Sequence, residues 1–200
     1  MGLRARGRGG NRQAGPGLLG KQDAQEEAGG RRGGGAEDHK PERYKMREKL
    51  LSIGDDFWIE TDRGRRAFKV DGKALRLRNT LVLEDARGNP VYEIQAKVVA
   101  IKDTMAVSKP RGRDMATVKH ALISPLRDRM SANMADGPDI DIRGNILNHE
   151  YTMERRGKRV AEVSKKWIAI RDTYTVEIAP GEDDALILAL TVVVEQMCQD

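Results

Sequence analysis

The sequence is poor in cysteine, and this excludes several classes of protein. Cys198 is the only cysteine in 200 residues, so the chain can form neither a disulfide within itself nor a zinc site built on several thiolates. Such sparing use of cysteine is typical of a reducing compartment. The start, MGLRARGRGG, also lacks the apolar stretch of a secretory signal. The sequence therefore predicts a cytoplasmic protein.

Aromatic residues are also scarce, and their distribution divides the chain. They make up 4% of the sequence, and all eight lie beyond residue 43. The first forty residues contain 12 of the 21 glycines and no valine, isoleucine or aromatic residue. Such a segment cannot bury enough apolar area to offset the entropy of ordering it. We expect a disordered Gly/Arg-rich tail over residues 1–40 and one folded domain over residues 41–200.

The folded domain has little excess charge of either sign. Residues 41–200 contain 28 lysines and arginines and 26 aspartates and glutamates. A domain dedicated to binding duplex nucleic acid would be strongly basic. The composition therefore argues against a specific nucleic-acid partner.

The domain shows strand-like alternation in place of long helical patterns. Turn signals interrupt short β-rich runs about every 8 to 12 residues, which is typical of an all-β sandwich or barrel. Asp71-Gly72 and Arg156-Gly157 separate alternating runs and predict tight hairpins, and consecutive hairpins predict an antiparallel meander. The predicted strands are residues 56–60, 65–70, 74–85, 91–101, 116–123, 139–142, 150–155, 158–170 and 174–179.

The C-terminal segment departs from this alternation. Residues 185–194, ALILALTVVV, have Thr191 as their only polar member and follow the capping residues Pro180-Gly181-Glu182-Asp183-Asp184. As a helix the apolar run would be about 15 Å long, too short for a bilayer core of about 30 Å. A helix apolar on every side must be buried all round, here inside the sheet. A buried strand remains the alternative, because three consecutive valines favour strands.

Several segments closely resemble the LURP-one-related family of the tubby C-terminal-like superfamily, which is distantly related to the phospholipid scramblases. The resemblance runs almost continuously from Tyr44 to Met197. It is carried by YKMREKLLSIG, DDFWIE, VDGKALRLRNTLVLED, GNILNHEY, VAEVSKKWIAIRDTYTVEIAPGEDDALILAL and TVVVEQM. It implies a mainly β fold: a closed antiparallel β-barrel of about twelve strands enclosing a hydrophobic C-terminal α-helix near residues 183–199.

The resemblance implies a binding role more than a catalytic one. Tubby proteins bind membrane phosphoinositides and scramblases act at membranes, whereas LURP-one-related members largely lack an assigned biochemical activity. We therefore expect a non-enzymatic binding or scaffold module, with anionic phospholipid headgroups or a protein partner as its ligand, cytoplasmic or peripheral at a membrane. No cofactor is expected. No segment matches the lipid-contacting residues of tubby one by one, so none is transferred.

One segment carries a marked charge bias. Residues 63–78 contain seven cations and a single carboxylate, Asp71. If two runs paired across Asp71-Gly72, the hairpin would present a basic outer face, worth about 1 kcal/mol per cation near an anionic membrane. The alternative is a solvated hairpin whose cations meet carboxylates such as Glu84 and Asp85. The candidate headgroup-binding residues are Arg63, Arg65, Arg66, Lys69, Lys73, Arg76 and Arg78.

Residues 139–150 approach the pattern of a calcium loop but do not complete it. Asp139, Asp141, Gly144 and Glu150 stand at loop positions 1, 3, 6 and 12, whereas Arg143 puts a cation where an oxygen ligand is needed. In a strand, the two aspartates would face one side and Ile140 and Ile142 the other. We predict a half-buried strand and no metal site.

Catalytic combinations are equally thin. His120 and His149 accompany no nucleophile elbow, and Cys198 has no paired base in the sequence. No catalytic residue is predicted. An enzyme with an unrecognised pocket at a barrel end remains one alternative. Weak nucleic-acid binding through the tail, at Arg6-Gly7-Arg8 and Arg31-Arg32-Gly33, is another.

Overall fold

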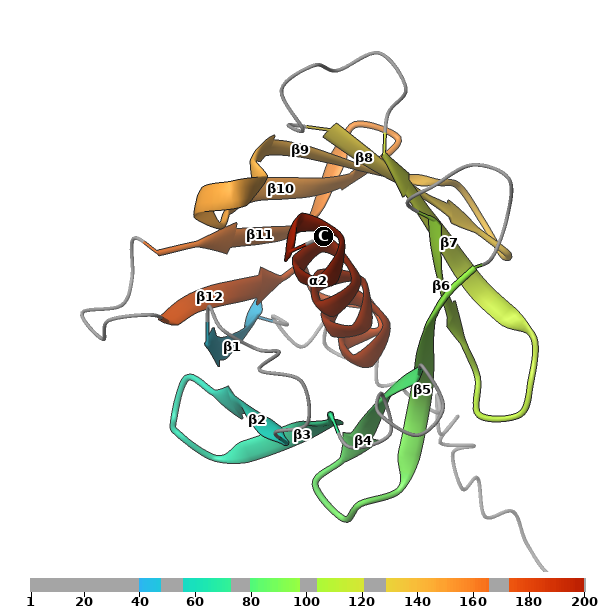
Figure 1. The fold of residues 1–200 in the computed structure, drawn as a ribbon. Coiled ribbons are helices and arrows are strands. Elements are labelled where there is room, and N and C mark those ends of the chain that lie inside the picture. The colour runs from blue at the N-terminus through green and yellow to red at the C-terminus, as the bar shows by residue number, and fades with distance from the viewer. Residues whose placement is uncertain are drawn as a thin grey trace, which may run out of the picture. The chain divides into compact units, whose positions relative to one another are not determined.

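The domain is a closed antiparallel barrel around one helix (Figure 1). The computed structural model describes residues 40–47, 56–72, 80–97, 104–120, 129–165 and 173–199. Each strand pairs with its neighbours in the chain, and β1 closes the ring on β12. The twelve strands are β1 Glu42–Arg47, β2 Phe57–Thr61, β3 Arg66–Asp71, β4 Thr80–Asp85, β5 Pro90–Ala96, β6 Thr104–Ser108, β7 Asp114–His120, β8 Arg129–Met134, β9 Ile140–Asn145, β10 Glu150–Arg155, β11 Lys158–Ser164 and β12 Thr173–Ile178. The predicted barrel is confirmed, and the predicted tail lies outside the described residues apart from Lys40.

Helix α2, Asp184–Gln199, runs through the middle of the ring of strands (Figure 1). Leu188, Leu190 and Val193 are fully buried because the wall surrounds the helix on all sides. Thr191 is also fully buried, and its hydroxyl donates to the carbonyl of Ile187 at 3.0 Å, so its polar group is satisfied within the helix. The predicted buried helix is confirmed, and the alternative of a buried strand is excluded.

The strands alternate as a barrel wall requires, with apolar side chains inward. In β9, Ile140 and Ile142 are fully buried, while Asp141 lies on the outer face and pairs with Arg129 and Arg143. The half-buried strand predicted there is confirmed.

Three strands were not predicted from the sequence: β1, β6 and β8. The sequence of β8, RMSANM, contains no β-branched or aromatic residue and carries little strand propensity. It becomes a strand because β7 and β9 pair with it on both sides and because Met130 and Ala132 fill the core. Tertiary pairing therefore overrides local preference here.

The meander gives the barrel two unlike ends. The short turns at residues 62–65, 86–89, 109–113, 135–139 and 156–157 all lie at one end, together with the 179–183 connection that starts α2. We call this the hairpin end. The C-terminal ends of β1, β3, β5, β7, β9 and β11 lie at the opposite, far end, where α2 finishes. Between β9 and β10, residues 145–149 form a turn that includes the 3-10 helix η1, Ile146–Asn148.

The two predicted tight hairpins have different outcomes. Arg156 and Gly157 both have positive φ, at 51° and 74°, and join the paired residues Arg155 and Lys158, so this hairpin is confirmed. The tight hairpin at Asp71-Gly72 is wrong. Asp71 pairs with Val82, so β3 is joined to β4 by a longer connection.

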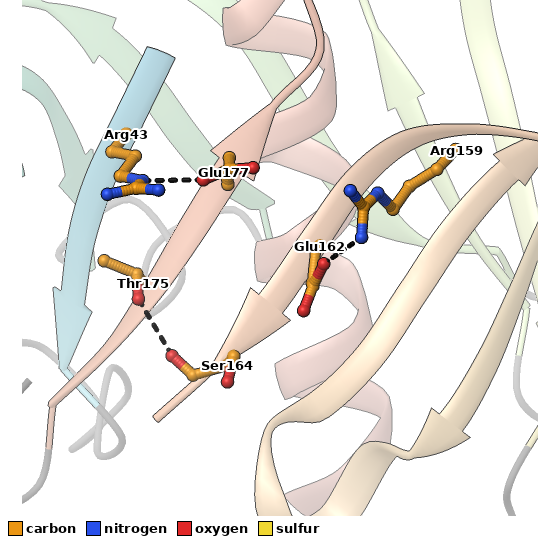
Figure 2. Close-up of polar contacts among 6 residues, drawn as sticks. All are labelled: Arg43, Arg159, Glu162, Ser164, Thr175 and Glu177. Carbon is orange, nitrogen blue, oxygen red and sulfur yellow. Dashed lines mark hydrogen bonds and ion pairs between the residues drawn. The ribbon is translucent and has the colours of Figure 1, made fainter. Parts of the chain in front are cut away.

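The barrel closes along the seam between β1 and β12. Arg43 and Glu177 stand directly opposite each other, and the guanidinium lies 2.6 Å from the carboxylate (Figure 2). On the other side of β12, the Thr175 hydroxyl donates to the Ser164 carbonyl at 2.9 Å. Strand β12 is therefore held to both of its neighbours, β1 and β11, by side-chain contacts as well as by the backbone ladder.

Gly144 is a position where only glycine fits. Its φ is +132°, and a Cβ there would lie 2.6 Å from the carbonyl oxygen of Glu150 and 2.8 Å from the Cα of Tyr151. We expect Gly144→Ala to lower the free energy of unfolding by about 3 kcal/mol or more, through backbone strain and overpacking together.

Gly64 supplies the matched control for Gly144. It has a φ of +74° but open space around its Cβ position, so Gly64→Ala should cost only the strain of about 1 to 2 kcal/mol. Equal losses for the two variants in urea denaturation would contradict the role assigned to close packing at Gly144.

Candidate functional site

At the hairpin end, two aspartates anchor the start of α2 to the wall. Asp183 caps the helix, since its Oδ1 accepts the Leu186 amide at 3.0 Å. The Tyr92 hydroxyl donates to the other oxygen of Asp183, and the Tyr44 hydroxyl donates to Asp184, both at 2.7 Å. Because Tyr44 lies on β1 and Tyr92 on β5, the helix is tied to two separate parts of the ring.

The environment keeps both tyrosines protonated. Burial, followed by the hydrogen bond to an aspartate, raises the pKa of Tyr44 and of Tyr92 far above the usual value. Lys109 lies over the Tyr92 ring, 4.1 Å from its centroid, and its Nζ is 3.0 Å from the hydroxyl. The carboxylates of Asp183 and Asp184 are thus committed to internal contacts.

The structure exposes part of the cationic segment singled out by sequence. Arg63 and Arg65 lie in the β2–β3 turn at the hairpin end, and both are exposed. Arg66 is exposed at the start of β3 and stacks over the Trp58 ring at 4.6 Å. None of the three guanidinium groups forms an ion pair with a described residue.

Lys69 belongs to a different environment. Its Nζ lies 3.1 Å from Asp56 and 3.3 Å from Glu84, and the side chain is largely covered. Burial acts to lower the pKa of Lys69, but the hydrogen bonds to the two carboxylates outweigh it and the pKa is raised. For Lys69, the alternative stated from the sequence is therefore correct: the cation pairs with neighbouring carboxylates, and Glu84 is one of the two that the sequence analysis named. The other predicted members, Lys73, Arg76 and Arg78, lie outside the described residues.

Sequence reasoning missed further cations at the hairpin end. Arg87, Lys109, Arg111 and Arg113 lie in the next two turns of that end, far from residues 63–78 in the chain. A repeated signal could have found them, because an Arg-Gly pair occurs in four of the hairpin turns. These pairs are Arg63-Gly64, Arg87-Gly88, Arg111-Gly112 and Arg156-Gly157.

At the far end lies a buried polar contact that no sequence motif predicted. His149 Nδ1 lies 2.7 Å from Glu195 Oε1, and the two residues are 8% and 4% exposed. The imidazole also stacks on the Tyr174 ring, with centroids 4.6 Å apart and planes 4° apart. His149 has a φ of 55°, a strained value for a residue other than glycine. The pair joins the η1 turn to the central helix.

The surroundings of this pair favour a structural role. Burial, and then the charge of Glu195, raises the pKa of Tyr151 well above its usual value. Within the described ranges, no three His, Cys, Asp or Glu side chains come close enough to hold a metal ion. Asp139, the first residue of the calcium-loop pattern, instead accepts hydrogen bonds from the Met134 amide and the Asn133 side chain.

Comparison with known proteins identifies the family. The family model described as LURP-one-related matches residues 42–195. The crystal structure of a protein from Arabidopsis thaliana has the same fold, with a TM-score of 0.60 and 20% sequence identity over 81% of this chain and 93% of that one. No curated protein matches the chain. The match spans every described strand and most of α2, and the chain is a member of the LURP-one-related family.

Proposed function

We propose that this protein is a non-catalytic binding module that docks on anionic phospholipid headgroups from the cytoplasmic side of a membrane. The observation that carries the proposal is the group of exposed arginines at the hairpin end, Arg63, Arg65 and Arg66, which form no ion pair with a described residue. Elsewhere, cations such as Lys69 and Arg43 are paired with carboxylates.

Because α2 fills the interior of the barrel, we expect a ligand to bind on the outer surface. Leu188, Leu190 and Val193 of α2 are completely buried against the wall, so the helix occupies the space in which many barrels hold a ligand. An outer surface with guanidinium groups that form no ion pair with a described residue suits phosphate esters, since arginine offers several donors in a planar fork. Across the described ranges, no helix has both the length and the hydropathy to span a bilayer.

The expected affinity is modest. At about 1 kcal/mol per cation near an anionic surface, three arginines supply about 3 kcal/mol, which is less than the roughly 4 kcal/mol of a millimolar complex. Binding through this turn alone would be weak and strongly salt-dependent. Measurable docking therefore requires further cations on the same face.

Co-sedimentation with liposomes tests the proposal. We expect the full chain to pellet with vesicles containing phosphatidylserine or phosphoinositides, and not with pure phosphatidylcholine vesicles. Raising the salt from about 50 mM to 500 mM should release it, because screening shortens the reach of exposed charges. Equal binding to neutral and anionic vesicles, or no binding to either, would reject the proposal.

Removal of residues 1–40 distinguishes the domain from the tail. This segment contains eight cations and five carboxylates, so it can contribute its own attraction to anionic surfaces. We expect anionic vesicles to retain most of their binding to the shortened chain. Complete loss would assign the interaction to the tail and return the nucleic-acid alternative to consideration.

A further inference from the structure

Most of the cations in the hairpin-end turns gather on one side of the ring. Three consecutive turns, β2–β3, β4–β5 and β6–β7, carry six cations and one carboxylate, Asp62. They are neighbours in space because strands β2 to β7 follow one another around the barrel. We call these six residues the basic arc. Its members are Arg63, Arg65, Arg87, Lys109, Arg111 and Arg113, all exposed.

The turns do not need arginine in order to fold. Gly64 and Gly88 supply the positive φ, at 74° and 84°, and the preceding residue can be any small polar one. Arg111 itself has a φ of 54°, a conformation in which asparagine or glycine would be less strained. Turn geometry therefore does not explain why arginine recurs at these tips, which favours a role for its positive charge.

Carboxylates near the basic arc are occupied by other groups. Asp85 accepts the amides of Arg87 and Asn89 and the Asn89 side chain, all within its own turn. The Asp183 carboxylate accepts hydrogen bonds from the Tyr92 hydroxyl and from the Leu186 amide. These contacts occupy both carboxylates within the protein.

The next turn around the ring has the other sign. The β8–β9 turn carries Asp136 and Asp139 and no cation, and Asp136 pairs with Arg113 at the border of the basic arc. The remaining arginines of the arc, Arg63, Arg65, Arg87 and Arg111, form no ion pair with a described residue. An anionic surface approaching this end would meet six cations in the three turns of the basic arc and one, Arg156, in the β10–β11 turn, which favours contact through the arc.

The mode of contact is electrostatic. Among the described residues, the only large hydrophobic side chain that is well exposed is Leu147, and it lies in η1 at the far end. No large hydrophobic side chain described at the hairpin end is well exposed, so none is placed to insert into a bilayer. A flat, negatively charged surface can contact the cations of all three turns at once.

We propose that the basic arc as a whole is the docking face, and that the barrel meets an anionic phospholipid membrane with its hairpin end. This inference rests on the proposed function and extends it from one turn to three. It adds Arg87, Lys109, Arg111 and Arg113 to the arginines of the β2–β3 turn.

A charge-matched pair of variants tests the position of the docking face. The arc variant of the full chain carries Arg63→Gln, Arg65→Gln, Arg87→Gln and Arg111→Gln. The control variant removes four exposed cations nearer the far end, through Arg47→Gln, Lys119→Gln, Arg129→Gln and Arg143→Gln. Both variants lose the same charge, and thermal unfolding followed by circular dichroism establishes that each is folded.

We expect the arc variant to lose partitioning onto phosphatidylserine vesicles by roughly 100-fold or more, since each cation near the surface is worth about fivefold. The control variant should lose less than about fivefold, because its cations lie outside the contact. A single-stranded RNA oligonucleotide, measured by fluorescence anisotropy at the same salt, should bind the wild type and the arc variant equally.

The other outcomes separate this inference from the proposed function. Equal losses for the two variants, or an unaffected arc variant, would overturn the basic arc while leaving headgroup binding standing. A wild-type chain with no preference for anionic vesicles would overturn both. Loss of RNA binding in the arc variant, at an affinity matching that for vesicles, would make the face a general polyanion site and overturn its assignment to membranes.

Discussion

Leu188→Asp or Leu190→Asp should prevent the barrel from folding. Both leucines are fully buried on the central helix. A carboxylate placed there without a partner loses its hydration, which costs several kcal/mol, and the leucine packing, worth about 2 to 5 kcal/mol, is lost as well. The sum is comparable with the whole stability of a typical domain, about 5 to 15 kcal/mol. Circular dichroism should show no cooperative thermal transition for either variant.

Leu147→Asp is the matched control for these two substitutions. Leu147 is 55% exposed in η1, so the same chemical change leaves the new carboxylate in water. Its effect on the free energy of unfolding should remain within about 0.5 kcal/mol. A cooperative transition of Leu188→Asp at the wild-type temperature would contradict the placement of α2 as the centre of the core.

Breaking the buried pair between His149 and Glu195 should cost about 3 to 5 kcal/mol, since removal of one partner leaves the other buried without compensation. The contact joins the η1 turn to the last part of α2 at 2.7 Å. Glu195→Ala leaves the imidazole against Tyr174 without its acceptor, and His149→Ala leaves a buried carboxylate without its partner. We expect both variants to fold at low temperature and to unfold at clearly lower urea concentrations.

A double-mutant cycle measures the coupling itself. If the pair acts as a unit, the double variant should lose much less than the sum of the single losses, with an interaction energy of about 1 to 3 kcal/mol. The exposed pair of Arg159 and Glu162 on β11 provides the comparison, and its coupling should not exceed about 1 kcal/mol. Additive losses at His149 and Glu195 would show that their contact does not hold the helix.

Much of the fold could be predicted because local and global preferences agree. The alternation in the sequence of β9 correctly predicts a strand of the barrel wall, with Ile140 and Ile142 inside and Asp141 outside. The same holds for the positive-φ turn at Arg156-Gly157. Local preference does not predict β8, whose residues acquire their conformation from pairing with two neighbouring strands.

The candidate site was predicted only in part, because sequence proximity is a poor guide to proximity on a barrel rim. Residues 63–78 are contiguous in the chain, yet β3 carries the backbone from the hairpin end at Arg66 to the far end at Asp71. Conversely, Arg87 and Arg111 lie in separate turns that the ring brings to the same end as Arg63. Tight turns at alternate strand junctions gather on one end of any meander, and this rule places the repeated Arg-Gly pairs together.

The buried pair lay beyond sequence reasoning for a different reason. His149 and Glu195 are 46 residues apart, and no spacing rule connects a 3-10 turn with a helix that threads a barrel. Their contact exists because α2 finishes at the far end, where the connection between β9 and β10 folds over it.

By itself, the sequence determined that this chain is a meander of short strands with one apolar segment that must be removed from water, because periodicity and hydropathy are local properties. Only the tertiary structure decided that twelve strands close into a ring around that segment, which of the described charges form ion pairs, and which turns share an end. Closure depends on pairing between β1 and β12, residues more than 120 positions apart, and such pairings are settled by the geometry of the whole ring.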